Sequence, residues 1–158
     1  MLGTLAKWLR ILGYDTLFDP SLNDHQLVRL ARAENRVLLT RDRELAGRRG
    51  VRTLLITGEH LNDQIQQVQA DLGLKGNRSF SRCPVCNGIL EDMDQEAARS
   101  RVPAYIFKTH KVFSYCPVCQ RIYWHGTHWQ RIDGRLTELG LDTSVLEEVS
   151  DRTGENGG

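Results

Sequence analysis

The apolar positions at the start of the chain follow the spacing of an α-helix. From Leu2 to Leu12, hydrophobic side chains recur every three or four residues, and Gly13 follows the last of them. This pattern predicts an amphipathic helix that ends at the glycine. Lys7 and Arg10 fall between the apolar positions, so both side chains are expected to face solvent.

Further along, short apolar runs alternate with segments of helical spacing. The continuous runs predict β-strands over residues 14–18, 36–40 and 51–57. Helical spacing predicts helices over residues 23–34 and 60–72, and Asn23 or Asp24 can cap the first of them. Helices that alternate with buried strands indicate an α/β fold, in which helices flank a small parallel sheet.

Four cysteines form two Cys-Pro-Val-Cys pairs in the second half of the chain. The pairs are Cys83–Cys86 and Cys116–Cys119, with 29 residues between them. Pairs of this spacing form tight loops whose four thiolates hold one tetrahedral, structural Zn²⁺. We therefore predict a zinc ribbon over residues 82–134, with strands over 105–115 and 121–126. Redox dithiols or an iron–sulfur cluster would use the same residues, but neither pair has a thioredoxin-like strand–helix context.

Composition and charge narrow the class of protein without identifying a ligand. The 158 residues are 40% hydrophobic and 26% charged, with a net charge of +1, as is typical of a soluble globular protein. The sequence has neither an apolar run of ~20 residues nor a secretory signal pattern, so we expect a cytoplasmic protein without a membrane partner. A mildly basic body precedes an acidic tail, which is compatible with a polyanionic partner but does not require one.

Basic and aromatic residues alternate around the second cysteine pair. Such a surface can neutralise phosphates while its rings stack on bases. The candidates for RNA binding are Lys108, Lys111, Tyr123, Trp124, His128 and Trp129. The alternative is that the rings form the small core of the ribbon and that the histidines are ordinary surface residues.

Two aspartates lie where an open parallel sheet binds its ligands, beyond the carboxyl ends of the strands. Asp42 follows the strand that ends at Thr40, and Asp24 opens the helix that precedes this strand. Carboxylates are ligands that Mg²⁺ and Mn²⁺ prefer, and a cluster of them can activate water for phosphodiester hydrolysis. The structural alternatives are that Asp24 caps its helix and that Asp42 only closes a turn through local hydrogen bonds.

The combination of four motifs is more specific than any one of them. In chain order they are "MLGTLAKWLRILGYDT", "DHQLVRLARAENRVLLTRDREL", "RCPVCNGIL" and "YCPVCQRIYWHGTHWQRI". Together they resemble the Mut7-C RNase family, in which a minimal PIN-like nuclease domain precedes a zinc ribbon. The resemblance covers roughly residues 1–134.

This resemblance implies a PIN-like fold and a metal-dependent ribonuclease site. Asp24 and Asp42 match acidic residues of the family, where Mg²⁺ or Mn²⁺ would bind, and Thr40 and Arg41 would shape the turn or contact phosphate. Cys83, Cys86, Cys116 and Cys119 match the zinc ligands of the ribbon, which would help to hold RNA. We therefore divide the chain into a PIN-like domain (1–73), a linker (74–81), a zinc ribbon (82–134), and a short helix with a disordered acidic tail (135–158).

The start of the chain leads to two hypotheses about activity. In this family a short strand that ends in Asp usually precedes the opening helix, and that Asp would be the first metal ligand, before Met1. Under one hypothesis, the native protein carries such a segment upstream and is an active ribonuclease. Under the other, it is an inactive module that binds nucleic acid or a protein. A structural zinc protein that binds no nucleic acid is a third alternative.

Overall fold

The computed structural model describes residues 2–74, 80–124 and 134, and the chain divides into two compact units. Unit 1 comprises Met1–Ala6 and Leu17–Lys75, and unit 2 comprises Lys7–Thr16 and Gly76–Gly158. No helix in the described part of the chain is long and apolar enough to span a membrane. The centre of the predicted linker (75–79) and the predicted C-terminal helix and tail (135–158) lie outside the described residues.

The boundary between the units falls within the first helix, α1 (Gly3–Ile11). Gly13, with φ of 89°, follows this helix as the sequence predicts, because a glycine adopts this left-handed backbone without strain. Residues Lys7–Thr16 belong to unit 2, whereas the division drawn from the sequence placed them in 1–73. Hydrogen bonds also join Arg10 and Thr16 to the first cysteine loop.

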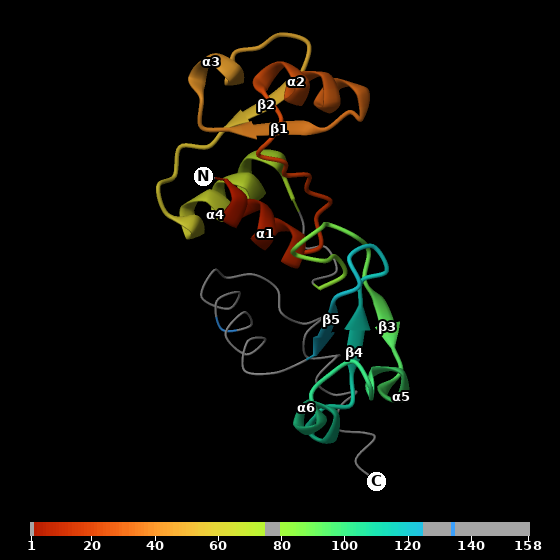
Figure 1. Cartoon of the computed structure of the whole chain (residues 1–158). Helices are drawn as coiled ribbons and strands as arrows, with labels where there is room; N and C mark the ends of the chain where they lie inside the picture. The colour runs from red at the N-terminus through yellow and green to blue at the C-terminus, as the bar shows by residue number, and fades with distance from the viewer. Residues whose placement is uncertain (1, 75–79, 125–133, 135–158) are drawn as a thin grey trace. The chain divides into compact units, whose positions relative to one another are not determined.

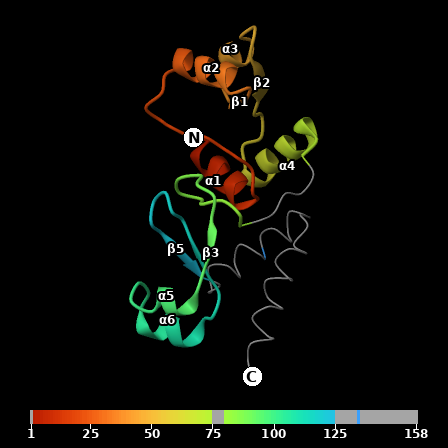
Figure 2. The same ribbon diagram turned by 90° about the vertical axis from the view of Figure 1, so that its right-hand side faces the viewer.

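Unit 1 is built around two parallel strands, as the alternating pattern predicts. β1 (Val37–Thr40) pairs with β2 (Arg52–Leu55) residue for residue along its whole length. Helices α2 (Asp24–Ala33) and α3 (Arg43–Ala46) lie on one side of this pair, and α4 (Leu61–Leu72) lies on the other (Figures 1 and 2). The short helix α3 lies in a polar segment for which the sequence pattern predicted no element.

One buried cluster of unit 1 joins α2, β1 and α3. Its buried side chains are Val28, Ala31, Leu38 and Leu45, with Leu27 and Val51 packed against them. Val28 and Ala31 are three residues apart on α2, so the helix presents one apolar stripe to the strands. This packing places the carboxyl end of β1 next to the start of α3.

Residues 14–18 form no strand, so this prediction from their apolar run is wrong. The backbone of Thr16 bonds to side chains instead of a neighbouring strand: its N–H donates to Asn87 Oδ1 at 3.0 Å, and its carbonyl accepts from Arg10 Nε at 2.8 Å. The apolar side chains of Leu17 and Phe18 are 46% and 43% exposed. The backbone of Thr16 therefore has hydrogen-bond partners without a sheet.

Unit 2 contains a three-stranded antiparallel sheet in the order β3 (Glu91–Met93), β4 (Phe113–Tyr115), β5 (Ile122–Trp124). Helices α5 (Gln95–Ala98) and α6 (Ala104–Thr109) lie between β3 and β4 in the sequence (Figure 1). The buried core consists of Ala98, Ile106 and Phe113, with Met93, Val102, Ile122 and Trp124 against it.

The first half of the strand predicted over 105–115 is helical, and this prediction is corrected. Pro103, with φ of −57°, precedes the first turn of α6 and suits a helix start. Ile106 then reaches the core beside Ala98 and Phe113, and Thr109 Oγ1 donates to the carbonyl of Tyr105 at 2.6 Å. Burial of one side of this turn overrides the strand preference of its aromatic and β-branched residues.

Candidate metal centre and carboxylate site

The first cysteine pair begins a tight loop closed by backbone hydrogen bonds. The N–H of Cys83 donates to the carbonyl of Gly88 at 2.7 Å, and the N–H of Asn87 donates to the carbonyl of Cys83 at 2.9 Å. Asn87 has φ of 70°, a left-handed conformation that asparagine adopts more readily than most residues. The chain therefore reverses directly after Cys86.

The second cysteine pair repeats this loop. The N–H of Cys116 donates to the carbonyl of Arg121 at 2.9 Å, and the N–H of Gln120 donates to the carbonyl of Cys116 at 2.8 Å. Gln120 has φ of 66° and occupies the position that Asn87 has in the first loop. The repeated Cys-Pro-Val-Cys motif thus forms the same backbone structure twice.

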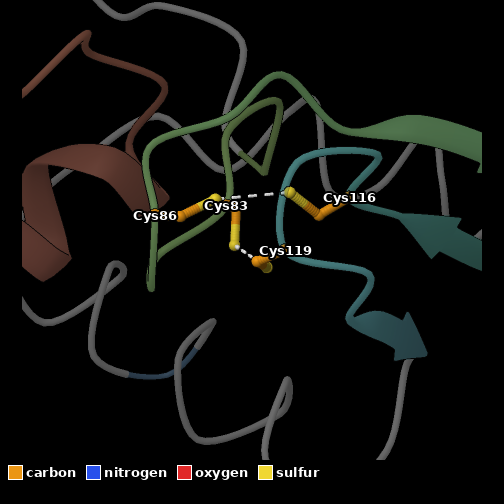
Figure 3. A group of neighbouring side chains, drawn as sticks. All are labelled: Cys83, Cys86, Cys116 and Cys119. Carbon is orange, nitrogen blue, oxygen red and sulfur yellow. Dashed lines mark hydrogen bonds between the residues drawn. The ribbon is translucent and has the colours of Figure 1, made fainter.

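The two loops bring the four cysteine side chains together (Figure 3). The Sγ atoms of Cys83 and Cys119 lie 3.7 Å apart, those of Cys86 and Cys116 lie 3.4 Å apart, and all four lie within 4.8 Å of one another. These separations are far longer than a disulfide bond of about 2.05 Å. Tetrahedral coordination with Zn–S bonds of about 2.3 Å places sulfurs about 3.8 Å apart. The cluster therefore fits one metal ion such as zinc.

Burial and hydrogen bonding shift the pKa values of the cysteine thiols in opposite directions. Burial raises the pKa of the Cys86 thiol to about 12. Burial also acts to raise the pKa of Cys119, but hydrogen bonds from Arg121, Cys116 and Cys83 outweigh it and lower that pKa to about 6. Neighbouring thiols of the cluster therefore lose their protons at very different pH values. A divalent cation bound to the four sulfurs would take the place of these protons.

Tyr123, in β5, and Gly88, in the first loop, both adjoin the cluster. The hydroxyl of Tyr123 lies 3.0 Å from Cys83 Sγ, and burial, followed by this hydrogen bond, raises the pKa of the phenol, so it stays neutral and can donate to a thiolate. A Cβ atom added at Gly88 would lie 3.1 Å from Cys116 Sγ and 3.0 Å from Val118 Cγ2. A glycine is therefore needed for the two loops to approach this closely.

Arg10 contacts the first loop, although its helical position predicted a solvent-facing side chain. Its relative exposure is only 7%, so that prediction is wrong; Lys7 is exposed as expected. Nη1 donates to the carbonyls of Pro84 and Val85, both at 3.1 Å. Burial lowers the pKa of Arg10, while the negative charge of the nearby Cys83 and Cys86 thiolates acts to raise it, and an arginine stays charged in either case. The three carbonyls, including that of Thr16, make burial of the charge tolerable.

Asn87 is a second residue whose role the sequence did not reveal. Its side chain donates from Nδ2 to Asp15 Oδ1 at 2.7 Å and accepts the N–H of Thr16 at Oδ1. Asp15 also lies 3.8 Å from the guanidinium of Arg82. The Asn-Gly dipeptide after the cysteine pair is a recognisable turn signal. Its bonding partners, more than seventy residues earlier, leave no local signal.

Asp24 is not the N-cap of α2, so helix capping does not explain this residue. Asn23 is the N-cap: its side chain accepts the N–H of Gln26, whose own side chain accepts the N–H of Asn23. Asp24 occupies the first helical position and is exposed. A carboxylate there is favoured by the helix dipole and leaves its oxygens accessible.

Asp42 makes local hydrogen bonds, as expected if its role is structural. It is the N-cap of α3, and its Oδ1 accepts the N–H groups of Glu44 at 2.7 Å and Leu45 at 3.0 Å. Thr40 is buried, and its Oγ1 accepts the N–H of Asp42 at 3.0 Å. Arg41 donates from Nη1 to the carbonyl of Gly58 at 2.9 Å, which ties the end of β1 to the chain after β2.

Within residues 2–74, 80–124 and 134, the cysteine cluster is the one set of three or more His, Cys, Asp or Glu side chains that can share a metal. Asp24 and Asp42 are thus not part of a carboxylate group of that size among these residues.

The candidates for RNA binding occupy different settings. Lys108 and Lys111 are exposed, on and after α6. Tyr123 contacts the cysteine cluster, and Trp124 packs against the core of unit 2. His128 and Trp129 lie outside the described residues.

Comparison with known proteins gives one match. The family model of the Mut7-C RNAse domain matches residues 1–136. No curated protein and no solved structure matches the chain.

Proposed function

Since the chain belongs to the Mut7-C RNase family, we propose that it is a metal-dependent ribonuclease whose PIN-like domain is followed by a zinc-binding ribbon. The observation that carries this proposal is the family match, which extends over both units. A ribonuclease-type function with RNA as substrate follows from the family. The metal dependence, the PIN-like fold and the roles of individual residues are proposed.

We assign the catalytic metal to Asp24 and Asp42, with Thr40 and Arg41 as supporting residues. Bound Mg²⁺ or Mn²⁺ supplies charge neutralisation and an activated water for phosphodiester hydrolysis. The hydrogen bonds from α3 hold the Asp42 carboxylate in one orientation, and Thr40 and Arg41 fix the strand end that carries it. We propose that the exposed carboxylate of Asp24, at the start of α2, binds the same ion or a water bound to it.

Charge in unit 1 supports an RNA substrate. Residues 29–52 contain eight arginines and three acidic residues, although the whole chain has a net charge of only +1. All of these arginines except the half-buried Arg36 are exposed. A basic segment next to the proposed carboxylates can neutralise the phosphates of a bound strand.

RNA cleavage tests the catalytic proposal. The protein, expressed with any residues encoded in frame before Met1, is incubated with single-stranded RNA and Mg²⁺ or Mn²⁺. Asp42→Asn keeps the N-cap acceptor, so stability should be preserved while cleavage falls by at least about 100-fold, because even loss of an outer partner of a metal ligand costs 10–100-fold. Asp24→Asn should behave similarly.

The matched control is Asp63→Asn, an exposed aspartate in the first turn of α4. This variant should retain wild-type cleavage, since it lies in a comparable helical position without a proposed metal. Full activity in Asp42→Asn, or no cleavage with either cation, would refute the catalytic proposal.

The second candidate function is RNA binding without turnover. It is favoured by the N-cap role of Asp42, which gives that residue a structural reason to be there. This function predicts RNA binding that weakens as salt rises and that is unchanged by Asp24→Asn or Asp42→Asn. A titration at several salt concentrations, run beside the cleavage assay, distinguishes the two functions.

For the cysteine cluster we propose one structural zinc ion. Cys83, Cys86, Cys116 and Cys119 would hold it, and four thiolates leave no position for a substrate. Cobalt substitution tests this proposal, because Co²⁺ in a tetrahedral four-thiolate site gives intense visible bands and sulfur-to-metal charge transfer. One equivalent of cobalt should produce this spectrum and one equivalent of zinc should bleach it. The spectrum of an octahedral ion would contradict the assignment.

A further inference from the structure

A network of hydrogen bonds attaches Lys7–Thr16 to the first cysteine loop inside unit 2. Arg10 donates to the carbonyls of Pro84 and Val85, the two residues between the cysteines of the first pair. The carbonyl of Ile11 accepts the N–H of Phe80 at 2.8 Å, shortly before that loop. These contacts link segments that are about seventy residues apart in sequence, as the separations of 74 and 75 residues for Arg10 show.

The residues after α1 add a second attachment to the same loop. Asn87 bonds through its amide to both Asp15 and Thr16, and it is itself only 8% exposed. Arg10 bonds to the other backbone group of Thr16, because its Nε donates to the carbonyl of that residue. One arginine therefore bonds simultaneously to the segment that follows its own helix and to the cysteine loop.

The second cysteine loop has the same backbone but a different support. The side chain of Gln120, at the position equivalent to Asn87, bonds locally to the hydroxyl of Tyr115 and to the carbonyl of Pro117 at 3.0 Å. Two arginines also reach this loop: Arg101 donates to the carbonyl of Gln120 at 3.1 Å, and Arg121 hydrogen-bonds to Cys119. Both are exposed, unlike Arg10. Only the first loop, within the described residues, is held by a buried cation from the N-terminal segment.

From this asymmetry we propose that Arg10 is a positioning residue of the metal site and couples metal binding to the docking of residues 7–16 on the first cysteine loop. Arg10 does not touch the metal ligands' sulfurs in the hydrogen bonds described. It acts by fixing the Pro84–Val85 peptide groups between Cys83 and Cys86, and by placing a buried positive charge beside their thiolates.

Charge balance gives the physical reason for this coupling. A divalent ion bound by four thiolates carries a formal charge of about −2, which is costly to bury without a compensating cation. Arg10 provides one positive charge in a setting with little solvent screening. Conversely, the three carbonyls that accept from Arg10 are neutral, so the anionic cluster supplies the countercharge that they lack. Each partner therefore stabilises the other, as linkage requires.

Zinc affinity of the intact chain provides the first test, which rests on the zinc binding proposed above. Arg10→Gln keeps a hydrogen-bonding side chain but removes the charge, and its zinc affinity, measured by competition with a chelator, should fall about 10–100-fold. Arg101→Gln is the matched control, because it removes an exposed arginine that contacts the other loop; its affinity should change by less than about fivefold.

Hydrogen exchange of the wild-type protein provides a test that needs no variant. Removal of zinc with a chelator should speed amide exchange in residues 7–16 as well as in the loops. The control is α2, in unit 1, whose exchange should be unchanged. In zinc-loaded Arg10→Gln, residues 7–16 should exchange faster than in the wild type.

The outcomes separate the two proposals. If the wild type takes up no zinc, both the zinc assignment and the coupling are wrong. If it binds zinc but Arg10→Gln binds as tightly, or if residues 7–16 exchange equally with and without zinc, the coupling alone is overturned. If Arg10→Gln does not fold, the exchange experiment on the wild type decides.

Discussion

At the scale of single residues, the cysteine cluster depends on neighbours that are not ligands. Gly88 is the clearest case, because the space beside it is occupied by Cys116 Sγ and by Val118. Val118 is 70% exposed and can turn away, whereas Cys116 is fully buried and has to keep its place in the cluster. The Cys116 thiol therefore limits the size of the side chain at position 88.

Replacing Gly88 with alanine should weaken zinc binding and lower the free energy of unfolding. The added methyl group overpacks the cluster, which costs about 1–3 kcal/mol. Thermal unfolding and chelator competition measure the two effects. Gly47→Ala is the control: its Cβ would meet its nearest atom, the carbonyl oxygen of Glu44, at an ordinary 3.5 Å, so stability should stay within about 0.5 kcal/mol. Equal behaviour of the two variants would contradict the packing argument.

At the scale of elements, side chains of helix α4 hydrogen-bond to the backbone at the end of β2 and just after it. Gln67 donates from Nε2 to the carbonyl of Leu55 at 2.6 Å and accepts the N–H of Thr57 at 3.0 Å. One amide side chain thus pairs with the backbone in the way that a neighbouring strand would. Gln64, which is buried, donates to the carbonyl of Gly58 at 3.0 Å and extends the same attachment.

Gln67→Glu should destabilise unit 1 because it keeps the shape but removes the donor to Leu55. The expected loss is about 1–2 kcal/mol in the free energy of unfolding, measured by urea denaturation. The neighbouring Gln66→Glu introduces the same charge on the exposed side of α4 and should change stability by less than about 0.5 kcal/mol. A loss of similar size in both variants would indicate a general charge effect instead of the lost hydrogen bond.

At the scale of the whole molecule, the chain divides into two units that differ in what stabilises them. Unit 1 contains an apolar cluster formed by α2, β1 and α3, whereas unit 2 combines a small apolar cluster with the four cysteines. Because a module of this size has little core, much of its folding free energy is expected to come from metal binding. Among the described residues of unit 1 there is no comparable cluster of three or more metal-ligating side chains.

Zinc should therefore stabilise unit 2 selectively. Each tenfold rise in free zinc above the dissociation constant should add about 1.4 kcal/mol to its free energy of unfolding. Hydrogen exchange measured over a series of zinc-buffered solutions would report this increase in β3–β5 and its absence in α2. Replacing Cys83 and Cys116 with serine should abolish the zinc dependence. Equal stabilisation of α2 by zinc would show that the units do not respond separately.

The sequence by itself determined those features that depend on neighbouring residues. Helical spacing located α2 and α4, apolar runs located β1 and β2, and each Cys-Pro-Val-Cys pair specified its own loop. The family assignment also came from the sequence, since the order of motifs along the chain is independent of contacts. These features were predictable because short-range periodicity and turn chemistry act within about ten residues.

Only the tertiary structure decided which of the remaining polar groups are buried and what they bind. Arg10 has the spacing of an exposed helical residue, but it is buried and donates to carbonyls of the first cysteine loop. Residues 14–18 have the apolar character of a strand, yet Asn87 and Arg10 take the hydrogen bonds of Thr16. The physical reason is that these partners are brought together by chain folding, which local periodicity does not encode.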